Sequence, residues 1–327
     1  MRILVTGCAG FIGFSLSSKL LKNFPKSKIF GIDNFDKYYS PELKKRRKNV
    51  LIKNKNFFFK KIDLNDQKIL EKFISKIKPE IIFNLAAQAG VRYSLINPRK
   101  YLNTNINGFF NLCEIAKKIK VKKIFYASSS SVYGESSLFP LKETYVIKPK
   151  NIYGLSKKIN EEMAEIYSSN SKIKFVGLRF FTVYGPWGRP DMMIQKYIFN
   201  SFKNKKFELY NYGNHTRDFT YIEDVTNILV KLIKKNIPKH EIFNICSSKP
   251  IHLKNVIGKL NHYLKQSKIV KKPLQKADIK KTHGSNKKIT KYVKYKNFYS
   301  FDYGIKKTFD WCQNYFEKNY NWFKIFS

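Results

Sequence analysis

The chain has few cysteines, few acidic residues and no long apolar run. Its four cysteines, Cys8, Cys113, Cys246 and Cys312, are scattered along 327 residues, without a Cys-x-x-Cys pair or a histidine at ligand spacing. We therefore expect free thiols in a reducing compartment and no metal site. No apolar run approaches the length of a membrane span, and the sequence enters a strand directly, without signal-peptide architecture. We expect a cytoplasmic protein that does not insert into membranes.

The shortage of acid leaves a large positive charge. The 23 Asp and Glu residues face 64 Lys and Arg, for a formal net charge of +41. Such an excess favours nucleic-acid or anionic-membrane binding. However, only eight of the basic residues are arginine, and the lysines are spread through every segment. Because phosphate and base recognition relies on the planar fork of arginine, we expect no specific nucleic-acid partner. The densest basic run, residues 44–48, is predicted to lie on a solvated helix face.

The N-terminal segment has the pattern of a dinucleotide-binding site. Residues 2–6 are predicted to form a buried strand, and the glycine-rich turn 7–13 leads into an apolar helical pattern. Such a turn lets the backbone approach a pyrophosphate at a helix N-terminus. A second strand, residues 29–32, ends in Asp33 and Asn34. An acid at this place accepts hydrogen bonds from a ribose 2′-hydroxyl and repels a 2′-phosphate, so NAD is expected rather than NADP.

Strand candidates alternate with helical stretches over the following residues. The strands are 57–59, 81–85, 124–127 and 175–178, and the helical stretches lie near 65–77, 100–119 and 155–169. This alternation is typical of a doubly wound parallel sheet, a Rossmann fold of the α/β class. Beyond residue 180 it loosens, and residues 219–233 and 242–245 return to the sheet layer. We predict an NAD-binding domain of residues 1–180 and 219–247, and a smaller, mostly C-terminal substrate-binding lobe of residues 181–218 and 248–327.

Polar clusters follow the predicted strands at the carboxyl ends, where ligands of such sheets bind. They include Asp63, the segment 86–88, the serines 128–131 and the segment from Thr182 onwards. The predicted cofactor contacts are Gly7, Gly10, Phe11, Ile12, Gly13, Asp33, Asn34, Asp63, Leu64, Leu85, Ala86, Ala87, Gln88, Asn103, Tyr153, Lys157 and Phe181.

A Tyr-x-x-x-Lys pair, Tyr153 and Lys157, indicates the chemistry. Residues four apart share one face of a helix, so the two heads can meet. A phenol with a pKa of about 10 is no base at neutral pH unless a fixed cation stabilises the phenolate. Lys157 and the positive ring of an oxidised nicotinamide would do so. The spacing alone is weak evidence in a chain rich in Tyr and Lys, but it gains force from the dinucleotide site upstream.

Five segments resemble the nucleotide-sugar epimerase/dehydratase group of the extended short-chain dehydrogenase/reductase family, and the resemblance covers nearly the whole chain. They are residues 6–13, 84–94, 126–134, 178–192 and 217–222. Within the group, residues 188–192 make the chain most similar to the UDP-glucuronate 4-epimerases. After Asp278 the family usually has a threonine and then a small residue with Asp, whereas this chain has Thr282-His283-Gly284-Ser285. Uridine contacts from the Lys-rich residues 260–290 therefore stay open.

The resemblance implies an NAD-dependent, redox-neutral isomerase that epimerises a UDP-hexuronate at C4. It would convert UDP-glucuronate to UDP-galacturonate through a 4-keto sugar, for polysaccharide precursor synthesis. It also implies tightly held NAD, a homodimer built on a four-helix bundle, and Ser129, Tyr153 and Lys157 as the catalytic set. The residues implied to contact the UDP-sugar, with Arg217 on the diphosphate, are Arg92, Ser128, Ser129, Ser130, Tyr153, Thr182, Arg189 and Arg217.

Other functions share part of this pattern. A UDP-glucuronate decarboxylase uses the same first oxidation, and another nucleotide-sugar epimerase would carry the same motifs. A 4,6-dehydratase is disfavoured, because Ser130 and Ser131 stand where that family has an Asp-Glu pair for water elimination. A non-catalytic NAD-binding protein recruited to RNA by its charge belongs to a different class. The intact set of Ser129, Tyr153 and Lys157 argues against it.

Overall fold

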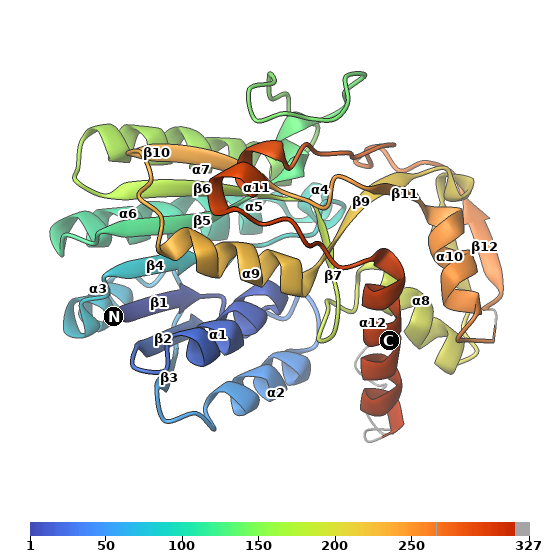
Figure 1. The fold of residues 1–327 in the computed structure, drawn as a ribbon, viewed down its shortest axis with the longest axis horizontal. Coiled ribbons are helices and arrows are strands. Elements are labelled where there is room, and N and C mark those ends of the chain that lie inside the picture. The colour runs from blue at the N-terminus through green and yellow to red at the C-terminus, as the bar shows by residue number, and fades with distance from the viewer. Residues whose placement is uncertain (266, 318–327) are drawn as a thin grey trace.

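The computed structural model describes residues 1–265 and 267–317, so residues 318–327 of the predicted lobe lie outside the described residues. At its centre is a seven-stranded parallel sheet (Figure 1). In spatial order its strands are β10 (His240–Ile245), β6 (Lys174–Phe180), β5 (Lys123–Ser129), β4 (Ile81–Asn84), β1 (Arg2–Thr6), β2 (Lys28–Asp33) and β3 (Phe57–Lys61).

Helices cover both faces of this sheet, because its strands are apolar on both sides. Successive side chains of β1 point to opposite faces, so that Ile3 and Val5 belong to one apolar core and Leu4 to the other. On the Ile3 side lie α1 (Phe11–Asn23), α2 (Pro41–Leu51), α9 (Ile222–Ile233) and α11 (Lys287–Val293). On the Leu4 side lie α3 (Gln67–Ile77), α6 (Gly108–Lys118) and α7 (Ile152–Ser169). The predicted doubly wound α/β fold is confirmed.

Capping residues set where several of these helices begin. The Ser40 side chain accepts a hydrogen bond from the Glu42 amide at the start of α2, at 3.2 Å. Asp66 caps α3 and Asn151 caps α7 in the same way. Each side chain supplies an acceptor to an amide that has no partner inside its helix. None of the described helices is long and apolar enough to cross a membrane.

Short elements surround the carboxyl end of the central sheet. A three-stranded sheet contains β11 (Pro250–His252), β9 (Thr216–Tyr221) and β7 (Thr182–Tyr184), and a two-stranded sheet contains β12 (Ile269–Lys272) and β8 (Phe207–Tyr210). The helices packed there are α8 (Met193–Phe202), α10 (Leu253–Asn261) and α12 (Phe301–Glu317) (Figure 1). Single-turn elements are α4 (Tyr93–Ile96), α5 (Pro98–Tyr101), the π-helix η1 (Leu102–Asn107) and the 3₁₀-helices η2 (Ser130–Tyr133) and η3 (Asn211–Gly213). One apolar cluster runs from Ile3 in β1 to Cys312 in α12.

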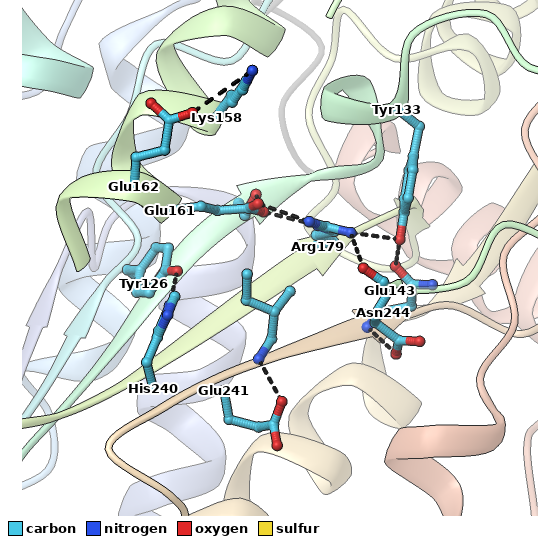
Figure 2. A network of polar contacts seen from close by, with 12 residues as sticks. Tyr126, Tyr133, Glu143, Lys158, Glu161, Glu162, Arg179, His240, Glu241 and Asn244 are labelled. Carbon is cyan, nitrogen blue, oxygen red and sulfur yellow. Dashed lines mark hydrogen bonds and ion pairs between the residues drawn. The ribbon is translucent and has the colours of Figure 1, made fainter. Parts of the chain in front are cut away.

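A buried polar network joins α7 to three strands (Figure 2). Arg179 of β6 donates from Nε and Nη2 to the two carboxylate oxygens of Glu161, at 2.9 and 2.8 Å. The hydroxyl of Ser128 in β5 donates to the same carboxylate at 2.5 Å. Nη1 of Arg179 donates to the Tyr133 hydroxyl at 2.9 Å, which in turn donates to Asn244 of β10 at 2.7 Å. Although burial opposes its charge, Arg179 has a pKa held above its ordinary value by Glu161.

We predict that Glu161→Gln lowers the free energy of unfolding by about 3–5 kcal/mol, because it leaves the Arg179 guanidinium buried without its carboxylate. The neighbouring residue gives a matched control. Glu162 lies 3.7 Å from Lys158 and its side chain is 58% exposed. Glu162→Gln should therefore cost less than about 1 kcal/mol. Denaturant titrations followed by circular dichroism compare the two variants, and equal losses would contradict the prediction.

Candidate functional site

A cavity of about 660 Å³ opens at the carboxyl ends of the parallel strands. One side is formed by the turns after β1, β2, β4 and β5, and the opposite side by β8 and residues 277–282. Every predicted cofactor or substrate residue lines it except Asn103. Side chains far apart in sequence thus meet at one edge of the sheet, as expected for a doubly wound fold.

The glycine-rich turn leaves no room for a side chain at Gly7 or Gly13. Gly7 has a φ of +65°, and a Cβ there would lie 2.7 Å from the amide nitrogen of Ala86. A Cβ on Gly13 would lie 2.1 Å from the carbonyl oxygen of Gly7. Gly10 is the N-cap of α1, with no side-chain cap, and the first turn of the helix carries no acid. The positive end of α1 therefore faces the cavity ready for an anion.

Two acids stand at the next strand ends. The Asp33 carboxylate accepts hydrogen bonds from the backbone amides of Ala9 and Phe35, at 3.1 and 2.8 Å. Burial raises the pKa of Asp33, although these bonds oppose the shift. The side-chain amide of Asn34 donates to Asp63 at 2.7 Å. A carboxylate can accept about four hydrogen bonds, so Asp33 keeps acceptor capacity for a ligand hydroxyl.

Tyr153 and Lys157 lie one turn apart at the start of α7, beside Ser129 at the end of β5. Burial raises the pKa of Tyr153, against a hydrogen bond with Ser129 and the charge of Arg189, which lower it. Burial also lowers the pKa of Lys157, to about 7. In the part of the chain that the structure describes, no carboxylate pairs with Lys157. Burial thus disfavours both the phenolate form of Tyr153 and the ammonium form of Lys157.

The predicted contact Asn103 lies outside this cavity. Its side chain is exposed, and the next residue, Thr104, lines the cavity instead. Both belong to the π-helix η1, whose i→i+5 hydrogen bonds shift the helix face relative to an α-helix. The same turn holds a buried residue that the sequence did not indicate. Asn105 accepts from the Gln88 amide at 2.9 Å and donates to the Ser156 hydroxyl at 2.9 Å, which joins the β4 loop to α7.

Arg189 and Asp191 form a two-pronged ion pair in the cavity wall. Nε and Nη2 of Arg189 donate to the two carboxylate oxygens of Asp191, at 3.0 and 2.6 Å. The Tyr38 hydroxyl donates to the same carboxylate at 3.2 Å. Burial opposes both charges, but Asp191 raises the pKa of Arg189 and Arg189 lowers that of Asp191, so both stay ionised. The hydroxyls of Thr182 and the serine run line the same cavity.

The far end of the cavity is cationic. Arg92 binds both carboxylate oxygens of Asp278, at 3.1 and 2.7 Å, and stacks 3.8 Å above the Tyr210 ring. Asp278 thus gives a firm position to the segment whose alignment the sequence left open. Burial lowers the pKa of Arg217 to about 10, and burial together with the Arg217 charge lowers the pKa of His215 to about 4. The Arg217 guanidinium, which donates to the carbonyls of Thr216 and Lys280, makes this end suited to a diphosphate.

The basic run of α2 is not solvated as predicted. Lys44 and Arg47, one turn apart, face the protein interior, while Lys45 is exposed. Nζ of Lys44 donates to the Asp36 carbonyl at 2.6 Å and lies 4.6 Å above the Tyr39 ring. The run has one buried face because its side chains meet acceptors on loops, which composition alone does not show.

Arg47 joins the two loops that form opposite parts of the site. Its side chain is fully buried. Nη1 donates to the Ala9 carbonyl in the glycine-rich turn, at 3.0 Å. Nη2 donates to the carbonyls of Trp187 and, at 3.1 Å, Gly188. Trp187 has a φ of +62°, in the region that favours glycine. Arg47 therefore stabilises the strained turn that ends at Arg189.

Comparisons with known proteins agree with this geometry. The model of the NAD dependent epimerase/dehydratase family matches residues 3–246. An uncharacterised protein of Methanocaldococcus jannaschii is 42% identical over 98% of this chain and 98% of its own length. UDP-glucuronate 4-epimerase 4 of Arabidopsis thaliana is 35% identical over 97% of this chain and 76% of its own. The crystal structure of UDP-glucuronic acid 4-epimerase from Bacillus cereus, in complex with UDP-glucuronic acid and NAD, matches with a TM-score of 0.91. It is 32% identical and covers 96% of this chain and 100% of that chain.

We predict that Arg47→Met loosens the two loops that Arg47 joins. Amide exchange, measured by mass spectrometry, should accelerate roughly tenfold to hundredfold in residues 7–13 and 185–191, because buried carbonyls without donors cost about 1–3 kcal/mol. Exchange in β5 and β6 should change little. Lys45→Met, on the exposed face of the same helix, is the control and should alter neither loop. Unchanged exchange in both loops of the Arg47 variant would show that these contacts carry no local stability.

Proposed function

The chain belongs to the NAD dependent epimerase/dehydratase family, and we propose that it interconverts UDP-glucuronate and UDP-galacturonate by inversion at C4 through a 4-keto sugar. The observation that carries this proposal is that Ser129, Tyr153, Lys157 and Arg189 line one and the same cavity. Two relatives support the substrate. They are the plant UDP-glucuronate 4-epimerase and the bacterial enzyme whose crystal structure holds UDP-glucuronic acid and NAD.

The N-terminal part of the cavity fits NAD. The uncapped end of α1 would take the diphosphate, with Gly10 and Gly13 allowing close approach, and Asp33 would accept from a ribose hydroxyl. Lys157, which pairs with no carboxylate among the described residues, would lie at the reacting end. Bound there, NAD would accept the hydride from C4 of the sugar and return it to the opposite face of the same carbon. The reaction then consumes no external oxidant.

Tyr153 is the proposed acid and base. It takes the proton of the C4 hydroxyl through Ser129 as the carbonyl forms, and returns the proton when the carbonyl is reduced. Burial works against a lone Tyr153 phenolate and against a lone Lys157 ammonium. Because the two charges have opposite signs, each lowers the cost of the other when they occur together. The pair therefore supplies a base that neither side chain offers alone.

The other part of the cavity would bind the UDP-sugar. Arg217 lies where a diphosphate would compensate its buried charge, with Arg92 beside it, and Arg189, Thr182 and the serines would surround the sugar. In this proposal residues 181–218 and 248–327 close over the substrate as a lobe, and residues 1–180 and 219–247 hold NAD.

We propose a homodimer formed through α6 and α7. Large apolar side chains are exposed on these helices and on the segments that they contact, among them Ile96, Leu102, Phe110 and Ile166. A second copy would cover them as a four-helix bundle, and the mass in solution, measured by light scattering, tests this.

The four cysteines are buried and free, which suits a cytoplasmic enzyme that supplies polysaccharide precursors. Cell fractionation tests the compartment.

Product analysis on a panel of UDP-sugars tests the reaction. UDP-glucuronate should give UDP-galacturonate without added oxidant, and Tyr153→Phe should lower turnover by roughly 10²–10⁴-fold, because a proton-transfer group is lost. Substrate affinity should change little in that variant. A UDP-pentose as the main product would favour the decarboxylase alternative. Near-normal turnover of the Phe variant would remove Tyr153 from its proposed role.

Arg189 should discriminate between charged and neutral sugars. Arg189→Ala is expected to raise the Kd of UDP-glucuronate roughly tenfold to hundredfold, because the Asp191 carboxylate is left facing the substrate without its counter-charge. UDP-glucose, which has no charge at C6, should lose far less affinity. Isothermal titration with both sugars makes the comparison. Equal losses would show that Arg189 holds only the diphosphate or the fold.

A further inference from the structure

Arg189, the residue proposed to bind the sugar carboxylate, is already paired with the carboxylate of Asp191. Nε and Nη2 of Arg189 form the edge that binds carboxylates in the two-pronged geometry, and both nitrogens donate to Asp191. The Tyr38 hydroxyl adds a third hydrogen bond to Asp191. The two charged side chains are only 19% and 30% exposed, and both line the cavity. A ligand carboxylate therefore meets a pair of zero net charge, with Nη1 of Arg189 as the guanidinium nitrogen left over.

The pairing of Arg189 with Asp191 lowers the affinity of the site for the C6 carboxylate of a hexuronate. An arginine without a partner would bind a C6 carboxylate through two charge-assisted hydrogen bonds, each roughly twice as strong as a neutral one. With Asp191 in place, the attraction of Arg189 is offset by the repulsion of a second carboxylate close by. The neutral hydroxyls of Thr182 and Ser130 line the same cavity and can donate to the carboxylate in addition. Each of them contributes a neutral hydrogen bond of modest strength.

A moderate affinity for the C6 carboxylate favours the reaction, because the sugar has to move between the two hydride transfers. The hydride leaves one face of C4 and returns to the other, so the ring must turn within the cavity. The C6 carboxylate turns with it and has to leave its first set of partners. Contacts that are made before the ring turns and lost while it turns lower kcat, because they stabilise the ground state and so raise the barrier to turning.

Resting on the proposed C4 epimerisation, we propose that Asp191 is a specificity-determining residue that keeps Arg189 from trapping the sugar carboxylate. By occupying the two-pronged edge of Arg189, it holds the affinity for UDP-hexuronates low enough for the 4-keto sugar to turn. Its negative charge also fixes the orientation of the Arg189 side chain.

The test uses the NAD-loaded enzyme with Asp191→Asn, which keeps the shape of the side chain and removes its charge. Kd is measured by calorimetry in a Tyr153→Phe background, where the sugar is not turned over, and kcat with Tyr153 intact. The Kd of UDP-glucuronate should fall roughly fivefold to twentyfold, and kcat on it should fall severalfold, as expected for stronger ground-state binding. The Kd of UDP-glucose should stay within about twofold, because it carries no C6 charge. Structural damage to the site would instead raise Kd for both sugars.

Two further variants make the outcome decisive. Asp191→Glu keeps the charge and should bind UDP-glucuronate no more tightly than the wild type. Asp191→Ser removes the charge with a smaller side chain and should show the same selective gain as Asp191→Asn, which covers the case that the Asn variant does not fold. An unchanged or raised Kd for UDP-glucuronate in the neutral variants, or an equal gain for UDP-glucose, overturns the role of Asp191. Failure of the wild type to epimerise UDP-glucuronate overturns the proposed function instead.

Discussion

The placement of α7 on the central sheet depends on the buried ion pair between Glu161 and Arg179. Tyr153, Lys157 and Glu161 follow one another at intervals of four residues on α7, so they share one face of the helix. Glu161 is bound by Arg179 from β6 and by Ser128 from β5, which fixes the rotation of α7 and its position along both strands. The phenol and the amine are therefore presented to the cavity by the same rigid frame that holds the serine run at the end of β5.

Arginine marks the site more clearly than net charge does. Five of the eight arginines lie in the cavity wall or in its buried support, namely Arg47, Arg92, Arg179, Arg189 and Arg217. A guanidinium group has five N–H donors in a fixed fork and keeps its charge when buried. Arg47 uses this fork to bind carbonyls from two loops, which the single ammonium of a lysine could not do in the same geometry. The +41 charge is carried mostly by lysines spread over the chain, so it says little about the chemistry.

The central strands could be predicted because burial on both faces makes them continuous apolar runs. The short strands β7, β8, β9, β11 and β12 could not, since each has only three to six residues. In addition, β8 pairs with β12, which lies about sixty residues away in the sequence. Most cavity residues were predictable because they follow strand ends. Asn103 lies outside the cavity, in a π-helix whose turn is wider than that of an α-helix. The burial of Arg47 depends on carbonyls 38 and 140 residues away, which no local pattern contains.

Two demands on the C6 carboxylate oppose each other in the proposed reaction. Oxidation at C4 makes a β-keto acid, which loses carbon dioxide when its carboxylate gives up negative charge, so donors that stabilise that charge protect the intermediate. Donors that bind it too strongly prevent the ring from turning. Neutral hydroxyls such as those of Thr182 and Ser130 can satisfy a carboxylate in more than one position, because each contributes a modest and replaceable hydrogen bond. An arginine already paired with Asp191 adds orientation with little net charge. Hydroxyl groups beside an ion pair of zero net charge therefore suit a site that must prevent loss of carbon dioxide and still let the carboxylate change partners as the ring turns.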